Sequence, residues 1–192
     1  MSKVPSFVVG YHGCDRADGE AAAISGAPLR MSNQNHDWLG EGTYFWDSDP
    51  RRALEWAEEK KGYHKCKDPF VVGAIIDLGY CLDLSLRENL EFLAGVYKTF
   101  ERERTALGLK MPVNRDSPNV TSKNKVIRSL DCAIINYVHT LNKRAGLRPF
   151  DTVRGLFVEG EPAYPGSEIY HKTHVQIAVR NPDCIKAVFI HR

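Results

Sequence analysis

The sequence predicts an α+β fold, and three observations lead to this expectation. Segments rich in β-branched and aromatic residues lie toward the two ends of the chain. Between them, within residues 85–145, two long stretches carry apolar residues at helical spacing. Strands clustered at both ends with helices inserted between them are typical of this class. The length of 192 residues fits a single domain over 1–192, with 85–145 as a helical insertion.

The first half of the chain alternates strands and short helices. Residues 6–12 are predicted to be a buried strand that ends at His12. Asp15 or Asp18 can cap a short helix through 20–24, and the polar segment 30–43 reads as a loop that leads into a strand at 43–46. Asp49-Pro50 predicts a helix start, since proline lacks an N–H that the first turn does not need. A strand rich in β-branched residues follows at 70–78.

The second half holds the insertion and three further strands. Apolar residues at 86, 90, 93, 97 and 100 predict one long helix, and those at 126, 130, 134, 137 or 138 and 141 predict a second, closed by Gly146. The segment 108–122, rich in proline and asparagine, is predicted to be a loop. Strands are expected at 153–158, 175–179 and 184–190.

Composition excludes several classes of protein. The net charge of +2 gives no strong pull toward nucleic acid or membrane. No apolar run approaches the roughly 20 residues of a membrane helix, and the N-terminus carries no signal-peptide core. The five cysteines are odd in number and scattered, which argues against a disulfide framework and against a zinc site. We therefore expect a cytoplasmic protein without a membrane partner and without a metal.

Two short motifs, in this order, carry the chemistry. Tyr11-His12-Gly13 ends the first apolar run, and Gly40-Glu41-Gly42-Thr43-Tyr44-Phe45-Trp46 leads from a glycine-flexed loop into three aromatic residues. Together they supply an imidazole that can bind a hydroxyl, a glycine whose backbone can approach a planar amide, and a ring to stack on that amide. The nicotinamide-ribose half of NAD needs these groups.

With the later segment Val72-Gly73-Ala74-Ile75-Ile76-Asp77-Leu78-Gly79, these motifs resemble the catalytic core of ADP-ribosyltransferases of the poly-ADP-ribose polymerase and diphtheria-toxin branch. That branch uses a histidine, a tyrosine and a glutamate on three strands. The resemblance covers about a third of the chain and implies a split, mostly antiparallel β-sheet core. The helices within 85–145 have no obvious equivalent in it.

The resemblance also implies roles for individual residues. His12 would bind the adenosine ribose, Gly13 would clamp the nicotinamide carboxamide, and Tyr44 would stack on the nicotinamide ring. The last member of the triad belongs on the penultimate strand, where this chain has Gln176 instead of glutamate. Catalytic residues are thus predicted to be His12, Tyr44 and Gln176. The family's second stacking tyrosine falls one place from Trp56, and its carboxamide-binding serine falls near Arg52, so both join His12, Gly13 and Tyr44 as NAD-binding candidates.

Glutamine in place of glutamate changes the chemistry. Cleaving NAD at the nicotinamide–ribose bond leaves a positively charged, oxocarbenium-like centre, which a nearby negative charge stabilises. Glutamine keeps a hydrogen bond but loses the charge and the basic group. Any base would come from elsewhere, and the candidates are His171, His174, Glu168 and Glu161.

Each of these residues has an ordinary structural interpretation as well. A lone His-Gly pair usually marks a strand end, and adjacent aromatics usually fill a core. Trp56 alone would be packing, and Arg51-Arg52 alone would be an exposed helix face. Cys14 lies beside His12, but a catalytic thiol needs an activating pocket. The joint order and setting of His12, Gly13 and Tyr44 favour the NAD interpretation over these alternatives.

The predicted function is transfer of ADP-ribose from NAD to a macromolecule. A neutral glutamine favours acceptors that are already nucleophilic, such as nucleobases of RNA or DNA, with a protein acceptor as the alternative. A basic run from Lys123 through Lys125, Arg128, Lys143 and Arg144 to Arg148 is either a solvated helix face, which we favour, or a phosphate-contacting stripe. The resemblance further implies a toxin of a toxin–antitoxin or phage-defence system with an antitoxin partner. An NAD glycohydrolase and an inactive NAD- or ADP-ribose-binding module are the other possibilities.

Overall fold

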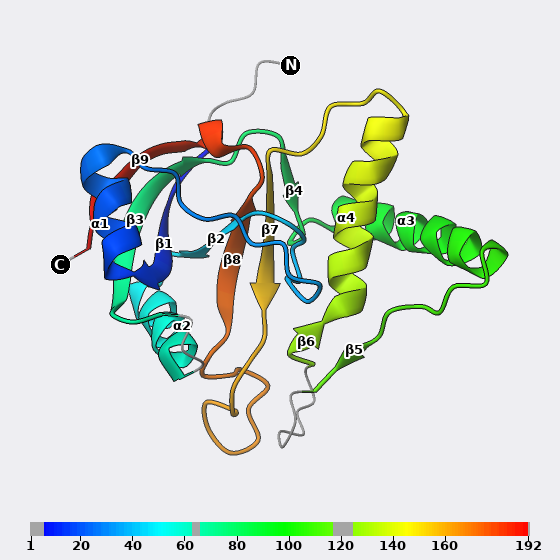
Figure 1. The fold of residues 1–192 in the computed structure, drawn as a ribbon. Helices are drawn as coiled ribbons and strands as arrows, with labels where there is room; N and C mark the ends of the chain where they lie inside the picture. Colours follow the sequence, from blue (N-terminus) through cyan, green and yellow to red (C-terminus); the bar gives the residue numbers. More distant parts are fainter. Residues whose placement is uncertain (1–5, 63–65, 117–124, 192) are drawn as a thin grey trace.

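The computed structural model of the chain describes residues 6–62, 66–116 and 125–191, and its main feature is one mixed seven-stranded sheet. The strands follow the spatial order β4-β7-β8-β2-β1-β3-β9 (Figure 1). Their bounds are Phe7–Asp15 (β1), Thr43–Asp47 (β2), Pro69–Asp77 (β3), Cys81–Asp83 (β4), Thr152–Phe157 (β7), His174–Val179 (β8) and Ile185–Ile190 (β9). Asn114–Arg115 (β5) and Ile127–Arg128 (β6) form a separate two-stranded ribbon.

Helices lie at both ends of the sheet. They are Arg16–Ser25 (α1), Pro50–Gly62 (α2), Arg87–Ala106 (α3) and Ser129–Arg144 (α4), with a short 3-10 turn at Pro182–Cys184. Figure 1 shows α1 and α2 beside β1, β3 and β9, and α3 and α4 at the other end, beside β4 and β7. The predicted α+β class is therefore confirmed, and both predicted long helices are present.

The sheet is antiparallel except where β4 pairs with β7 in parallel. Its weakest junction is between β1 and β2, which align only at Gly10↔Asp47 and Tyr11↔Trp46, whereas β1 and β3 pair over nine residues. The strands β1 and β2 therefore diverge just after Tyr11. The sheet is continuous and has an opening between β1 and β2, whereas the expectation was a split pair of sheets.

Local sequence signals explain how the first helices begin. The Asp15 carboxylate accepts a hydrogen bond from the Ala17 N–H at 3.3 Å and is the N-cap of α1. Asp49 does the same for α2 by accepting from the Arg52 N–H at 2.9 Å. Gly26 ends α1 with a φ of +69°, a conformation that glycine adopts without strain.

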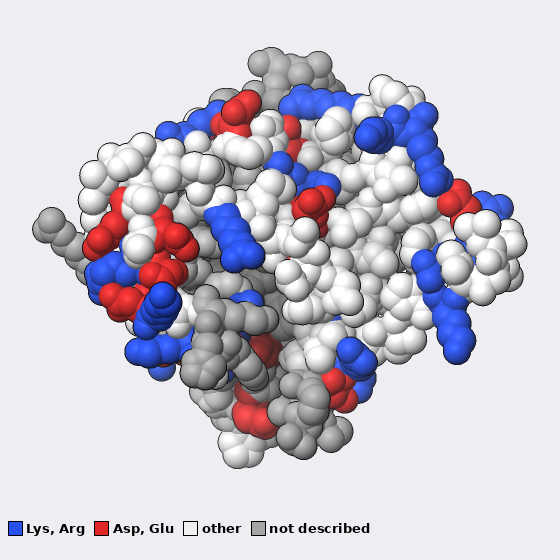
Figure 2. Space-filling model, viewed as in Figure 1, with Lys and Arg blue, Asp and Glu red and all other residues white. Residues whose placement is uncertain are grey.

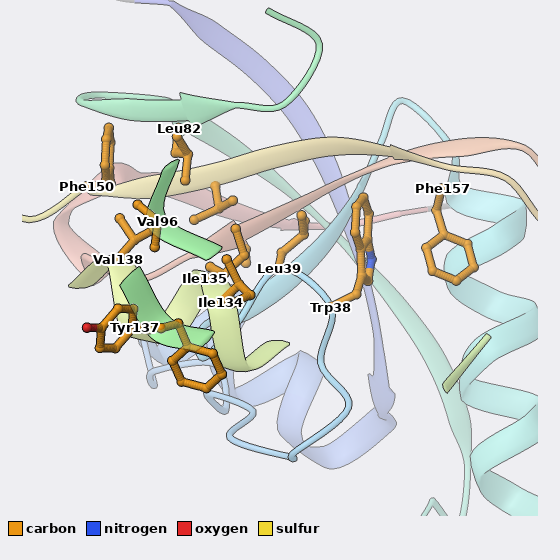
Figure 3. Packing of buried hydrophobic residues seen from close by; sticks show 13 residues of the cluster. Trp38, Leu39, Leu82, Val96, Ile134, Ile135, Tyr137, Val138, Phe150 and Phe157 are labelled. Atoms are coloured by element: carbon orange, nitrogen blue, oxygen red, sulfur yellow. The ribbon is translucent and has the colours of Figure 1, made fainter. Parts of the chain in front are cut away.

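The helical insertion brings its own core. Trp38, Leu82, Val96, Ile135 and Phe150 belong to one buried cluster in which α3 and α4 pack against β4, β7 and β8. Figure 3 shows that Trp38 and Phe157 lie together at one end of this cluster, apart from the residues grouped around Val138. Trp38, from the segment that precedes β2, therefore packs in the same cluster as the helices of the insertion.

Three details of the predicted elements were wrong. The first strand does not end at His12 but continues to Asp15, because β3 pairs with it as far as Asp15↔Pro69. The second long helix begins at Ser129 rather than near Val126, since Ile127–Arg128 pairs with Asn114–Arg115. The short strand Cys81–Asp83 was not anticipated. The predicted loop 108–122 contains the short strand Asn114–Arg115, and its residues 117–122 lie outside the described residues.

Candidate active site

A cavity of about 540 Å³ lies where β1 and β2 diverge. His12 and Gly13 of β1, Tyr44 of β2 and Gln176 of β8 all line it, so residues from three parts of the sequence meet at one place. Its volume falls within the roughly 300–1,000 Å³ range of small-molecule sites. The structure thus brings together all three predicted catalytic residues.

His12 is held in one tautomer at this opening. Its Nδ1 lies 2.7 Å from the Tyr44 carbonyl oxygen, which can only accept, so Nδ1 carries the proton and Nε2 keeps a lone pair. Burial lowers the pKa of His12 below its ordinary 6.5, against the smaller opposing effects of the Tyr44 carbonyl and Asp18. A neutral His12 therefore offers a hydrogen-bond acceptor at Nε2, which suits a ribose hydroxyl.

Gly13 is required by the packing of α2 on β1. A Cβ atom at Gly13 would lie 2.1 Å from the Ala53 carbonyl oxygen, far inside any allowed contact. The first turns of α2 consequently approach the strand closely, and the Gly13 backbone lines the cavity. The structure thus gives this glycine a packing reason that is independent of any ligand.

Tyr44 supports the loop that precedes it. Its hydroxyl donates to the Gly40 carbonyl oxygen at 2.8 Å and accepts from the Leu39 N–H at 3.0 Å. Burial raises the pKa of Tyr44 well above its ordinary 10.0, so the hydroxyl stays protonated. Because the hydroxyl is engaged in the loop, only the ring of Tyr44 is left to contact a ligand.

Gln176 is oriented by Trp38. The indole Nε1–H of Trp38 donates to Gln176 Oε1 at 2.5 Å, and since an indole nitrogen can only donate, the amide oxygen must face it. The Gln176 NH₂ group is therefore the end of the amide that remains to bind a ligand. Trp38 itself is fixed by Phe157, whose ring centroid lies 5.2 Å away, and by Gly155, where a Cβ would lie 2.7 Å from the indole.

Two further tryptophans form walls of the cavity. Trp46 and Trp56 both line it, with their ring centroids 5.6 Å apart. The ammonium of Lys60 lies 4.6 Å from the centroid of the Trp56 ring and also lines the cavity. Trp56, a predicted binding residue, is thus placed at the site.

Arg52 is the predicted binding residue that the structure does not bring to the cavity. It is buried on α2, where its guanidinium contacts Glu159 at 3.1 Å and Glu59 at 3.7 Å and lies 5.9 Å from the Trp46 ring centroid. These two carboxylates balance the positive charge of the Arg52 guanidinium. Arg52 therefore supports the wall behind Trp46, and its direct contact with NAD remains a prediction.

Sequence reasoning missed the segment 30–38 as part of the site. Arg30, Gln34 and Asp37 on this loop line the cavity, as does Asp18 at the start of α1. Asp37 accepts a hydrogen bond from the Gln34 N–H at 2.7 Å, which closes the loop on itself. The polar, glycine-bearing composition of 30–43 indicated a loop, but no spacing pattern indicated that it would fold over the cavity.

The predicted alternative bases do not line this cavity. His174 is buried and stacks on Phe157, with its Nδ1 donating to the Lys172 carbonyl oxygen at 2.6 Å. The carboxylates among the described lining residues are instead Asp15, Asp18 and Asp37. Burial raises the pKa of Cys14 to about 12, so this thiol is not an activated nucleophile.

The basic run is largely neutralised. Lys125 pairs with Asp116 at 2.6 Å, Arg128 with Asp131 at 3.5 Å, Arg144 with Glu103 at 3.3 Å, and Arg148 with Asp151 at 2.6 Å. Lys123 lies outside the described residues. Figure 2 shows Lys and Arg dispersed over the visible face and interspersed with Asp and Glu, which fits a solvated surface better than a phosphate-contacting stripe.

The chain is 27% identical over 195 residues to the uncharacterized protein MJ0359 of Methanocaldococcus jannaschii, a match that covers 92% of this chain and 83% of that protein. No family model matches the chain. No solved structure matches it either. Within the described residues, none of the helices has the length and apolar character needed to cross a membrane.

Proposed function

We propose that the protein binds NAD in the cavity between β1 and β2 and transfers ADP-ribose to a macromolecule. The observation that carries this proposal is the meeting of His12, Tyr44 and Gln176 around one cavity, on strands β1, β2 and β8, which are neighbours in the sheet. The chain order and the penultimate position of β8 are those that the resemblance to ADP-ribosyltransferases implied. An ADP-ribosyltransferase-like fold is part of this proposal.

Each residue has a role that its geometry supports. The Nε2 lone pair of His12 accepts from a ribose hydroxyl, and the Gly13 backbone contacts the carboxamide. The rings of Tyr44, Trp46 and Trp56 enclose the nicotinamide. Because the indole N–H of Trp38 donates to the amide oxygen of Gln176, the NH₂ group of Gln176 donates to a ribose hydroxyl oxygen.

In the reaction, the bond between C1′ of the ribose and the nicotinamide nitrogen breaks, and nicotinamide leaves with the electron pair. A lone pair of the acceptor forms the new bond to C1′, and the acceptor then loses a proton to solvent or to a carboxylate of the site. Asp18 and Asp37 line the cavity and provide negative charge that Gln176 does not.

The acceptor and the cellular setting are separate parts of the proposal. The expectation of a nucleobase acceptor came from the neutral Gln176 and from the possibility that the basic run contacts phosphates. The ion pairs of the basic run argue against that phosphate contact. Toxin activity, an antitoxin partner and a cytoplasmic location follow from the resemblance alone and stay predictions, as does the absence of a metal.

An inactive NAD-binding module is the second candidate, and the neutral Gln176 favours it. Nicotinamide release separates the possibilities when the purified protein is incubated with NAD alone, with RNA, with DNA and with lysate protein. A transferase releases nicotinamide faster with one acceptor and incorporates label from NAD into it. A glycohydrolase releases it equally in every mixture. Binding without release identifies the inactive module.

A further inference from the structure

A second cavity, of about 420 Å³, shares a wall with the candidate NAD site. Trp38 lines both cavities, so the indole that orients Gln176 also separates them. The other walls are mostly aliphatic and come from α3, α4, β6, β7 and the end of β4: Leu84, Leu90, Leu93, Ala94, Tyr97, Arg128, Leu130, Asp131, Ile134, Ile135 and Leu156. A cavity with such walls takes an apolar group.

Exposed apolar side chains line this second cavity. The helical stripe of α3 is buried at Val96 and Phe100, but toward its start Leu90 is 50% exposed. Leu156 on β7 is 55% exposed. Leu90 and Leu156 both line the cavity, so exposed apolar side chains from a helix and a strand converge on it. Such convergence marks interaction sites.

Within the described residues, the outer edge of β7 is open at Leu156, beside the same cavity. Among the described residues, β4 pairs with β7 only over Thr152–Arg154, and the Leu84 N–H extends this pairing by donating to the Arg154 carbonyl oxygen at 2.8 Å. Successive residues of a strand direct their backbone groups to alternate sides, so the N–H and C=O of Leu156 face the same outer side as those of Arg154. These groups are a template for another extended chain.

Charge favours a polypeptide over a nucleic acid at this place. Arg128 lines the second cavity, but it pairs with Asp131, and the neighbouring Lys125 pairs with Asp116. Nucleic-acid affinity depends on unneutralised cations that contact phosphates. An extended peptide, in contrast, gains main-chain hydrogen bonds at a strand edge and specificity from a pocket for one side chain.

We propose that an extended segment of an acceptor protein docks along the outer edge of β7 and places an apolar side chain in the second cavity. The assignment of this segment as acceptor rests on the proposed transferase function. Gly155 pairs with Gln176 across β7 and β8, so a chain on the far side of β7 lies two strand spacings, about 10 Å, from Gln176.

A binding assay without NAD tests the docking surface by itself. The probes are fluorescein-labelled heptapeptides of alternating threonine and lysine with a central leucine, the same peptide with central alanine, and the leucine peptide methylated on its backbone nitrogens. We expect the leucine peptide to bind about tenfold more tightly than either of the other two, by fluorescence anisotropy. Leu90→Asp and Leu156→Asp should abolish this preference, whereas Leu107→Asp, at an exposed position beyond α3, should keep it.

A second assay connects the surface to transfer. Labelled NAD is incubated with lysate, and protease-sensitive label is compared with nicotinamide release in buffer. We expect Leu90→Asp and Leu156→Asp to lower protein labelling about tenfold and to leave release within twofold of the parent. If the three peptides bind equally, or if only nuclease removes the label, the docking proposal is wrong. The proposed transferase function is not contradicted by either result. If the protein prefers the leucine peptide but releases no nicotinamide from NAD, the proposed transferase function is wrong. The docking surface is not contradicted by that result.

Discussion

At the residue scale, the hydrogen bond from Trp38 to Gln176 decides what the site can do. A glutamate in this position would accept from a ribose hydroxyl, whereas this amide presents its NH₂ group because its oxygen faces the indole. The sequence indicated Gln176 through its place on the penultimate strand. It did not indicate Trp38, which is 138 residues away in the chain, because contacts over that distance leave no local pattern.

Substitution of Gln176 separates binding from chemistry. If its amide binds the ribose as charge develops, Gln176→Ala should lower the transfer rate at least about tenfold and NAD affinity by less, because such an interaction strengthens in the transition state. Gln176→Glu still accepts from Trp38 and restores a negative charge, so nicotinamide release should rise. Rates and NAD affinities of the two variants check this. Transfer by Gln176→Ala at the parental rate would place the third catalytic residue elsewhere.

Tyr44→Phe tests the role of the tyrosine hydroxyl. The change removes the hydrogen bonds to Leu39 and Gly40 and leaves a buried N–H without its partner, which should lower the free energy of unfolding by about 1–3 kcal/mol. The ring remains, so NAD affinity should fall less than in Tyr44→Ala. Urea denaturation measures the first effect and calorimetry the second. Tyr164→Phe, at an exposed tyrosine, is the control and should leave both quantities unchanged.

At the element scale, the close approach of α2 to β1 shapes the cavity. Local signals predicted this helix well, since Asp49 and Pro50 mark its start. They did not predict how near it lies to the strand, because that distance depends on side chains that meet only in the folded state. The continuation of β1 beyond His12 was missed for the same reason, as β3 provides the pairing.

Gly13→Ala should disturb this approach. The new methyl group would lie 2.1 Å from the Ala53 carbonyl oxygen, so α2 must shift, at a cost of about 1–3 kcal/mol in the free energy of unfolding. Gly95→Ala is the matched control, because no atom lies within 4 Å of the added Cβ and alanine favours a helix by about 0.5–1 kcal/mol. Denaturant unfolding of both variants gives the comparison. A Gly13→Ala protein as stable as the parent would show that the helix packs less closely than described.

At the scale of the whole molecule, the strand clusters and the insertion were predictable from hydrophobic periodicity. The order of the seven strands was not, because β7 and β8 come from the end of the chain and join the sheet beside β2. The cavity exists only through this long-range order. His12 and Tyr44 could be selected from motifs, whereas the loop 30–38 and the second cavity emerge from tertiary packing alone.

Acid should destabilise the protein through its buried histidines. Burial, with the charge of Arg180, lowers the pKa of His139 from 6.5 to about 4. The unfolded chain then binds a proton below pH 6.5 that the folded chain binds only near pH 4, so stability is full above pH 6.5 and falls as the pH drops toward 4. This one group accounts for a loss on the order of 2–3 kcal/mol.

His12 and His174, whose pKa values burial also lowers, act in the same direction. The variant His139→Phe keeps a ring beside Phe150 and removes the titrating group, so its unfolding free energy should change less between pH 7 and pH 4.5. Urea denaturation at the two pH values measures the difference. An identical pH dependence in parent and variant would show that folding does not lower the pKa of His139.

The central claim, that NAD binds at the opening between β1 and β2, is tested most directly by calorimetric titration of NAD into the parent and His12→Ala proteins. His12→Ala removes the Nε2 acceptor, and we expect the parent to bind NAD and the variant to bind it about 5- to 100-fold more weakly, the loss expected for one buried hydrogen bond. A folded His12→Ala protein that binds NAD as tightly as the parent, or a parent that does not bind NAD, would contradict the claim.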